Sequence, residues 1–334
     1  MNNAKLTIIS LFALIATLIL SLSGCGGSSP AATGGTGGGT TAINEIYVAN
    51  FAGNSITAYG RTNSGNAVPL RTIAGAATGL SMPIGITVDT ANNEIYVTSW
   101  GNAINVFTRT GNGDIAPIRS ITGGATGMNT PYSVALDSVN NEIAVVNSNG
   151  NSITIYARTA NGNVAPLRTI AGALTGLATP VSATIDTVNN EILVVNYSPA
   201  NSITVYSRTA NGNVAPIRTL TGAATDLVSP FSISLDTTNN EIVVANSASN
   251  SVTVYPRNAN GNTPPLRTIW GATTIIANPR GVFVDTVNNE IVVANYVGYI
   301  TAYPRTATGN TLPSRSISGA ATGLTSPWGI VIAP

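Results

Sequence analysis

A phrase made of Asn-Glu and an apolar residue recurs six times after residue 43, with its glutamates 48 to 50 residues apart. Those glutamates are Glu45, Glu94, Glu142, Glu191, Glu241 and Glu290. Three other markers keep the same register: an aromatic residue two positions before an arginine, a second arginine ten positions later, and a proline that opens a short apolar run. Six copies of a unit of this size indicate a repeat architecture, in which each module buries apolar surface against its neighbours.

Each repeat contains four short runs that are typical of β-strands. In the second copy they cover residues 85–89, 94–98, 103–108 and 118–121, which are rich in Val, Ile, Thr and Tyr and partly alternate in polarity. Asn-Asn, Gly-Asn and Asn-Gly pairs between the runs favour tight turns. Four antiparallel strands in each of six repeats predict an all-β protein, a six-bladed β-propeller.

The two ends of the repeated region are out of phase, and this offset predicts a closed ring. The region opens at Glu45 with a strand of the second type and finishes at residues 327–332 with a strand of the first type. Three N-terminal strands and one C-terminal strand would then share the sixth blade. Such a blade locks the ring and removes the open sheet edge that a seam would expose.

The repeated units resemble those of NHL-type and related six-bladed propellers. The likeness rests on Pro-x-Gly-Ile-x-Val-Asp, then Asn-Glu-Ile-x-Val, then Asn-Ser-Ile-Thr-x-Tyr-x-Arg, and it covers residues 44–334. The resemblance implies a fold but not a function, because propellers of this kind include lactonases, binding modules and scaffolds.

The N-terminus has the pattern of an export signal, with a charged start followed by a nearly uniform apolar run over residues 6–22. The run ends in Leu22-Ser23-Gly24-Cys25, which resembles the lipobox of bacterial lipoproteins. That resemblance implies a cleaved signal peptide over residues 1–24 and acylation of Cys25, the only cysteine, so that lipid chains hold the protein on a membrane. Residues 25–43, rich in Gly, Ser and Thr, are expected to form a flexible tether. We therefore expect a lipid-anchored protein of the bacterial cell envelope, and Gly26 after the cysteine fits outer-membrane sorting where two membranes are present.

The composition excludes several classes of function. The chain has no histidine, which removes the commonest general base and metal ligand. A single cysteine excludes an internal disulfide framework and thiolate zinc sites. The 14 basic and 13 acidic residues nearly balance, so we expect no nucleic-acid partner.

Most charged residues follow the repeat, and we therefore interpret them as structural. Besides the six glutamates, one aspartate ends the first strand of five repeats: Asp89, Asp137, Asp186, Asp236 and Asp285. Their hairpins could hold calcium through oxygen ligands, but a turn in which the acids bind backbone N–H groups or the repeated arginines explains them better. We expect no catalytic residues and no metal, with a calcium-dependent hydrolase of the lactonase type as an alternative. Against it, the positions that would carry ligands in such lactonases, just after each repeat's proline, include no acid.

The positions that vary between repeats are the candidates for binding. Residues just after the proline are Ile84, Tyr132, Val181, Phe231, Arg280 and Trp328, and further aromatics stand in variable loops. Aromatic side chains on variable loops over a rigid scaffold are typical of binding surfaces. We therefore predict a non-catalytic module that binds an envelope protein, a small molecule or a glycan through one loop face. A structural scaffold in which the same aromatics only pack is the second alternative. The candidate contact residues are Phe51, Trp100, Tyr132, Tyr197, Phe231, Trp270, Arg280, Tyr296, Tyr299 and Trp328.

Overall fold

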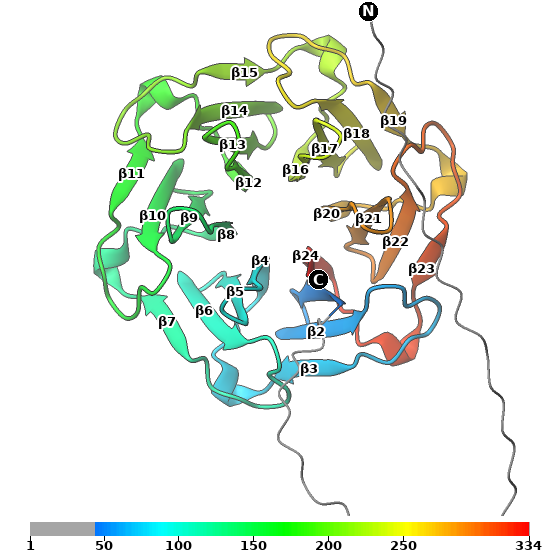
Figure 1. The fold of residues 1–334 in the computed structure, drawn as a ribbon, viewed down its shortest axis with the longest axis horizontal. Coiled ribbons are helices and arrows are strands. Elements are labelled where there is room, and N and C mark those ends of the chain that lie inside the picture. The colour runs from blue at the N-terminus through cyan, green and yellow to red at the C-terminus, as the bar shows by residue number, and fades with distance from the viewer. Residues whose placement is uncertain (1–43, 334) are drawn as a thin grey trace, which may run out of the picture. The chain divides into compact units, whose positions relative to one another are not determined.

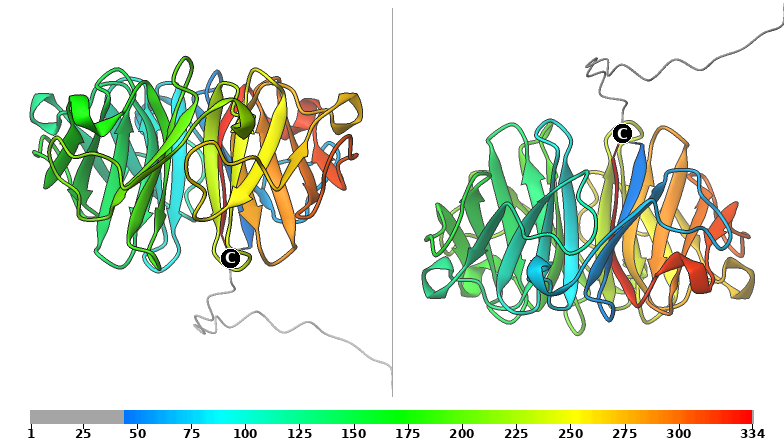
Figure 2. Two further views of the ribbon diagram at one scale, coloured as in Figure 1. Left: turned by 90° about the horizontal axis from the view of Figure 1, so that it is seen from above. Right: turned by 90° about the horizontal axis from the view of Figure 1, so that it is seen from below.

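The computed structural model describes residues 44–333, and they form six four-stranded antiparallel sheets around a central axis (Figure 1). The sheets are blades of a propeller, and the predicted fold class is confirmed. Seen edge-on in Figure 2, the strands run between the two faces of the ring. The expected signal peptide, the expected acylation site Cys25 and the expected tether fall outside the described residues.

We number the blades by chain order and give each from its inner to its outer strand. Blade 1 is β24 (Pro327–Ala333), β1 (Glu45–Asn50), β2 (Ser55–Gly60) and β3 (Arg71–Ala74); blade 2 is β4 (Pro83–Asp89), β5 (Glu94–Ser99), β6 (Ala103–Thr108) and β7 (Arg119–Thr122); blade 3 is β8 (Pro131–Asp137), β9 (Glu142–Asn147), β10 (Ser152–Ala157) and β11 (Arg168–Ala171). Blade 4 is β12 (Pro180–Asp186), β13 (Glu191–Asn196), β14 (Ser202–Ser207) and β15 (Arg218–Leu220); blade 5 is β16 (Pro230–Asp236), β17 (Glu241–Asn246), β18 (Ser251–Pro256) and β19 (Arg267–Ile269); blade 6 is β20 (Pro279–Asp285), β21 (Glu290–Asn295), β22 (Tyr299–Pro304) and β23 (Arg315–Ile317). A 3-10 turn precedes each inner strand: η1 (Ala76–Thr78), η2 (Gly124–Thr126), η3 (Ala173–Thr175), η4 (Ala223–Thr225), η5 (Ala272–Thr274) and η6 (Ala320–Thr322).

The ring closes as the sequence offset predicts. β24 pairs antiparallel with β1, with Ile332 opposite Ile46 and Ile330 opposite Val48. At the axis, β24 also packs beside β20 on one side and β4 on the other. Blade 1 is therefore built from both ends of the repeated region, and the first and last repeats cannot separate without losing a sheet.

The core lies between neighbouring blades. Between blades 5 and 6, for example, buried Val and Ile side chains of β17 and β18 pack against those of β20 and β21. The repeated tyrosine of the third strand is buried in this layer, and in five blades its hydroxyl donates to the carbonyl oxygen that ends the preceding 3-10 turn. For Tyr206 the hydroxyl lies 2.5 Å from the Thr175 oxygen, and burial raises its pKa to about 12. The tyrosine thus fixes the connection that delivers each inner strand to the axis.

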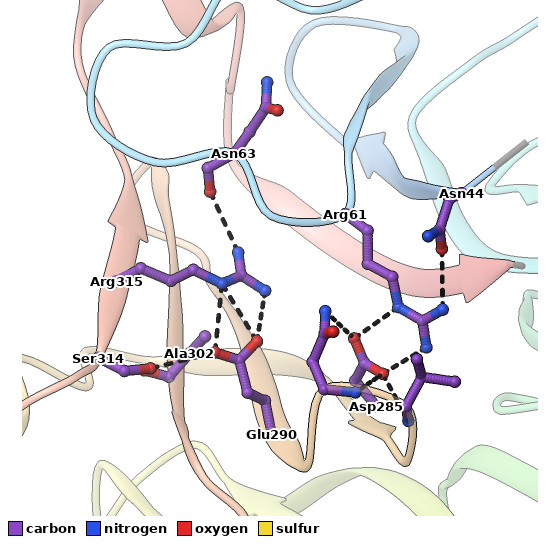
Figure 3. A network of polar contacts seen from close by, with 10 residues as sticks. Asn44, Arg61, Asn63, Asp285, Glu290, Ala302, Ser314 and Arg315 are labelled. Carbon is purple, nitrogen blue, oxygen red and sulfur yellow. Dashed lines mark hydrogen bonds and ion pairs between the residues drawn. The ribbon is translucent and has the colours of Figure 1, made fainter. Parts of the chain in front are cut away.

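Ion pairs also hold the blades together. The aspartate that ends an inner strand pairs with the first repeated arginine of the next blade; the pairs are Asp89–Arg158, Asp137–Arg208, Asp186–Arg257, Asp236–Arg305 and Asp285–Arg61. Figure 3 shows the last of these, which joins blade 6 to blade 1, beside the Glu290–Arg315 pair within blade 6. Every repeated glutamate pairs in that second way with the outer-strand arginine of its own blade.

The same aspartates close their hairpins. Asp186, for example, accepts the backbone N–H of Val188 at 3.0 Å and of Asn189 at 2.9 Å. Burial would raise its pKa, but the Arg257 guanidinium and these N–H groups outweigh burial and leave the pKa lowered. The predicted contacts of the repeated acids with backbone N–H groups and with the repeated arginines are confirmed.

Candidate functional site

One face of the ring gathers the ends of the strands that vary most, and we call it the mouth face. The register of blade 1 defines it: Pro327 at the start of β24, Asn50 at the end of β1 and Ser55 at the start of β2 lie side by side. Ala74, where the outer strand ends, lies opposite Ser55 and so belongs to the same face. The loops between second and third strands and the connections between blades therefore meet here.

The residue after each inner-strand proline lies in a β-bulge. In blade 6, Pro279 pairs with Asn295 and Gly281 with Ala294, which leaves Arg280 as the extra residue. Blades 3 to 5 have the same shift of register, and in blades 1 and 2 the irregularity covers two inner-strand residues, 328–329 and 84–85. A bulge redirects the side chain that it carries. The six bulge positions hold the variable residues Ile84, Tyr132, Val181, Phe231, Arg280 and Trp328, and all six line the cavity at the axis.

Seven aromatic rings form one connected cluster at this mouth. The ring of Trp328 lies 4.5 Å from that of Phe51, 5.4 Å from Phe231 and 5.6 Å from Tyr296, measured between centroids. The remaining members, Trp100, Tyr132 and Tyr197, join it at centroid distances of 5.7 to 6.2 Å. The mouth aromatics, as we call these seven residues, come from all six blades and two types of segment, yet they pack as one group.

The mouth aromatics differ in how much surface they expose. Trp328 is 8% exposed and Phe231 5% exposed, and both pack with Ile84 and Val181 in the core below. Trp100 is 39% exposed, while the other four are half-buried. Trp328 and Phe231 thus form the floor of the cluster, and Trp100 stands at its rim where a partner can reach it.

Arg280 is the charged member of the site. Its guanidinium carbon lies 4.2 Å from the centroid of Phe231, 5.1 Å from that of Trp328 and 5.5 Å from that of Tyr296. These distances are those of cation–π contacts. Burial lowers the pKa of Arg280. Its Nε is buried and, among residues 44–333, forms no hydrogen bond.

Below the mouth, the six inner strands enclose a cavity of about 190 Å³ on the axis. None of the residues that line this cavity is acidic. Hydroxyl groups line it at six positions: Thr87, Ser133, Ser182, Thr184, Ser232 and Ser234. Several of these hydroxyls accept a backbone N–H of the next blade, as Ser232 does from Val282 at 3.2 Å. The cavity therefore offers neutral polar groups under an aromatic and cationic rim.

Two of the candidate residues lie on the mouth face but outside the cluster. Trp270 follows the outer strand β19 and is 61% exposed, beside Asp226 and Val228 in a shallow groove at the periphery. Tyr299 begins β22, and its hydroxyl donates to the Ile275 carbonyl at 2.6 Å. The structure thus brings together eight of the ten candidates, the seven mouth aromatics and Arg280.

Sequence reasoning missed two features of the site. One is the bulge itself, for which the strand-opening proline is the only local signal. The other is the indole N–H of Trp328, which is buried without an acceptor among the described residues. Within those residues, no three acidic or cysteine side chains gather as a metal site would require, and no helix has the length and hydrophobicity of a membrane span.

Comparison with known proteins identifies the fold only. No family model matches the chain, and no curated protein matches it in sequence. Among solved structures, a similar chain occurs in the crystal structure of a nidogen/laminin complex, with a TM-score of 0.62 and 13% sequence identity over 87% of this chain and 98% of that chain. At this identity the likeness extends to the β-propeller fold and no further.

Proposed function

We propose that this protein is an exported, lipid-anchored propeller that binds a ligand or a partner protein through the mouth aromatics and has no catalytic centre of its own. The observation that carries the proposal is the gathering of seven rings from all six blades at one end of an otherwise repetitive ring. A ring of repeats needs no such cluster to close, because blade packing and ion pairs already hold it.

The proposal extends to the location of the protein in the cell. Acylation of Cys25 would hold the ring near a bacterial membrane, and a partner in the envelope, either a protein or a small molecule such as a glycan, fits that place. The repeat phrases support kinship with NHL-type propellers. The fold neighbour comes from a structure named as a complex of two proteins, which supports a protein-binding role for a ring of this shape.

The catalytic alternative has less support than binding. The carboxylates at the ends of the inner strands lie away from the mouth and are engaged by arginines and backbone N–H groups. We therefore propose that binding needs no calcium, and that a chelator leaves it unchanged.

A scaffold role has one specific observation in its favour, the burial of Trp328 and Phe231 in the core. Trp100 separates the two proposals because it is exposed and contributes less to the core. If the face binds, Trp100→Ala should weaken capture of the partner by roughly tenfold or more, as expected when a tryptophan that contacts the partner is truncated. If the ring is only a scaffold, the substitution leaves every interaction unchanged.

The test is capture of envelope components by the purified ring, followed by affinity measurement with the component identified. Trp270→Ala is the matched control, because it removes an exposed tryptophan on the same face but outside the cluster. Loss of capture in Trp100→Ala with retention in Trp270→Ala supports the proposal, and equal capture by both variants contradicts it. Anchoring is tested separately: Cys25→Ser should move the protein out of the membrane fraction, and a variant that stays there would contradict acylation.

A further inference from the structure

We infer that the mouth is a receptor for a carboxylate group, which Arg280 binds while the rings around it hold the apolar body of the same ligand. The inference rests on the proposed function and adds the chemical class of the ligand. It is carried by the charge, the hydrogen-bonding state and the surroundings of Arg280.

Arg280 lacks a counter-charge among the described residues. Among the described residues, eleven arginines form ion pairs with Asp or Glu, and a twelfth, Arg109, contacts the hydroxyl of Tyr47. Arg280 has no acidic partner within residues 44–333, and its charge is balanced only by the faces of three rings. Arg280 is half-buried, and a guanidinium that loses part of its hydration without gaining an anion is in an unfavourable state, so the site is poised to accept one.

Two hydrogen-bond donors at the mouth have no acceptor among the described residues. The Nε of Arg280 and the indole Nε1 of Trp328 are both buried and, among the described residues, neither has a hydrogen-bond acceptor. The guanidinium carbon lies 5.1 Å from the centroid of the Trp328 ring, so the two residues that carry these donors are in contact. Buried donors are normally satisfied, and a carboxylate supplies two acceptor oxygens that suit the fork of an arginine.

The single positive charge at the mouth favours a carboxylate over a doubly charged anion. The only lysine is Lys5, and the other arginines are engaged elsewhere, so the mouth provides one positive charge. One guanidinium neutralises a carboxylate but only half of a phosphate or sulfate dianion. Phe231 and Tyr296 on either side favour a ligand whose charged end is attached to an apolar or aromatic group.

A matched pair of probes tests the inference: N-acetylphenylalanine, which carries the carboxylate, and its uncharged amide. Isothermal calorimetry on the folded protein should show the acid binding at least about tenfold more tightly than the amide, since hydrogen bonds to charged groups contribute that much. Inorganic sulfate should bind more weakly than acetate. Equal binding of acid and amide, or no saturable binding of the acid up to about 10 mM, overturns the inference.

Arg280→Val is the decisive variant, because Val181 already occupies the same bulge in blade 4 and shows that the fold accepts valine there. It should abolish the preference for the acid over the amide, while Arg280→Lys keeps part of it. A preference that survives in Arg280→Val overturns the inference. Should that variant fail to fold, the acid should still raise the melting temperature of the wild-type protein and the amide should not.

Competition experiments distinguish a free acid from a peptide carboxyl terminus as the source of the carboxylate. The Trp100→Ala variant separates the carboxylate inference from the proposed function. A free acid as the natural ligand is indicated if acetylphenylalanine competes with small acids from an extract, and a peptide carboxyl terminus if only peptides with a free C-terminus compete. If Trp100→Ala abolishes partner capture while no carboxylate probe binds, the proposed function stands and the carboxylate inference falls.

Discussion

The ion pair between Asp186 in β12 and Arg257 in β18 should contribute several kcal/mol to the stability of the ring. The Asp186 side chain is 0% exposed and that of Arg257 is 8% exposed, so both charges have left water. In Arg257→Met the carboxylate keeps its N–H donors from Val188 and Asn189 but loses its counter-charge. Because an unpaired buried charge is left behind, we expect a loss of about 3–5 kcal/mol in the free energy of unfolding at pH 7.

The loss should depend on pH in a defined direction. In the wild-type protein the pKa of Asp186 is lowered, against burial, by Arg257 and the backbone N–H groups. The stabilisation is therefore complete above the unfolded carboxyl pKa of about 3.9 and is lost as the pH falls through the lower folded value. Without Arg257, burial raises the pKa of Asp186 relative to that in the wild type. The variant then takes up its proton at higher pH, and its deficit should shrink between pH 7 and about pH 3.

Urea denaturation followed by tryptophan fluorescence measures the deficit, provided that the slopes of the two transitions agree. Arg168→Met is the control, because its partner Glu142 is 14% exposed and Arg168 itself is 16% exposed. This pair keeps more contact with water than the Asp186–Arg257 pair, so Arg168→Met should destabilise the ring less than Arg257→Met does. A deficit in Arg257→Met that equals the control, or that does not change with pH, would refute the assignment of this pair as a tie between blades.

Two further substitutions and one deletion test the packing of the ring by thermal and chemical denaturation. Gly281→Ala should destabilise it by about 1–3 kcal/mol, since the added Cβ would lie 2.4 Å from the Trp328 carbonyl oxygen, whereas Gly101→Ala, with no atom within 4 Å, should have little effect. Tyr206→Phe leaves the buried Thr175 carbonyl without its donor and should lower stability by about 1–3 kcal/mol, and an unchanged midpoint would contradict that bond. Deletion of β24 leaves β1 unpaired on one side, so circular dichroism should show no cooperative transition; a truncated chain that unfolds like the full one would disprove closure by this strand.

The fold could be predicted in detail because the same pattern of strand and turn residues occurs in all six repeats. Turn pairs such as Asn-Asn separate strands of similar length, and the offset between Glu45 and Pro327 determines how the ring closes. The bulges could not be predicted, because they depend on the register between two strands and not on the identity of either. Arg280 is therefore recognisable in the sequence as an exception, but its direction toward the axis is not.

The membership of the site was only partly predictable for a related reason. A position in a loop tells which face of the ring a residue occupies, but its distance from the axis depends on the strand to which the loop leads. Trp100 follows a second strand and reaches the cluster, whereas Trp270 follows an outer strand and stays at the periphery. The burial of Trp328 depends on how closely six inner strands converge, which no single repeat encodes.

The three charges that break the repeat differ in what they do for the fold, and this difference singles out Arg280. Asp114 accepts the backbone N–H of Ala77 at 2.7 Å, and asparagines accept the equivalent N–H in the other five blades. Asp226 follows the 3-10 turn η4 in a left-handed conformation, and glycine takes that position after four of the other five 3-10 turns. Both therefore replace another residue in a structural task. Arg280 replaces residues such as Val181 that need no partner, and it brings into the mouth a half-buried guanidinium that has no acidic partner among the described residues. Since stability alone favours an uncharged side chain at that bulge, the presence of arginine there is explained by what binds to it.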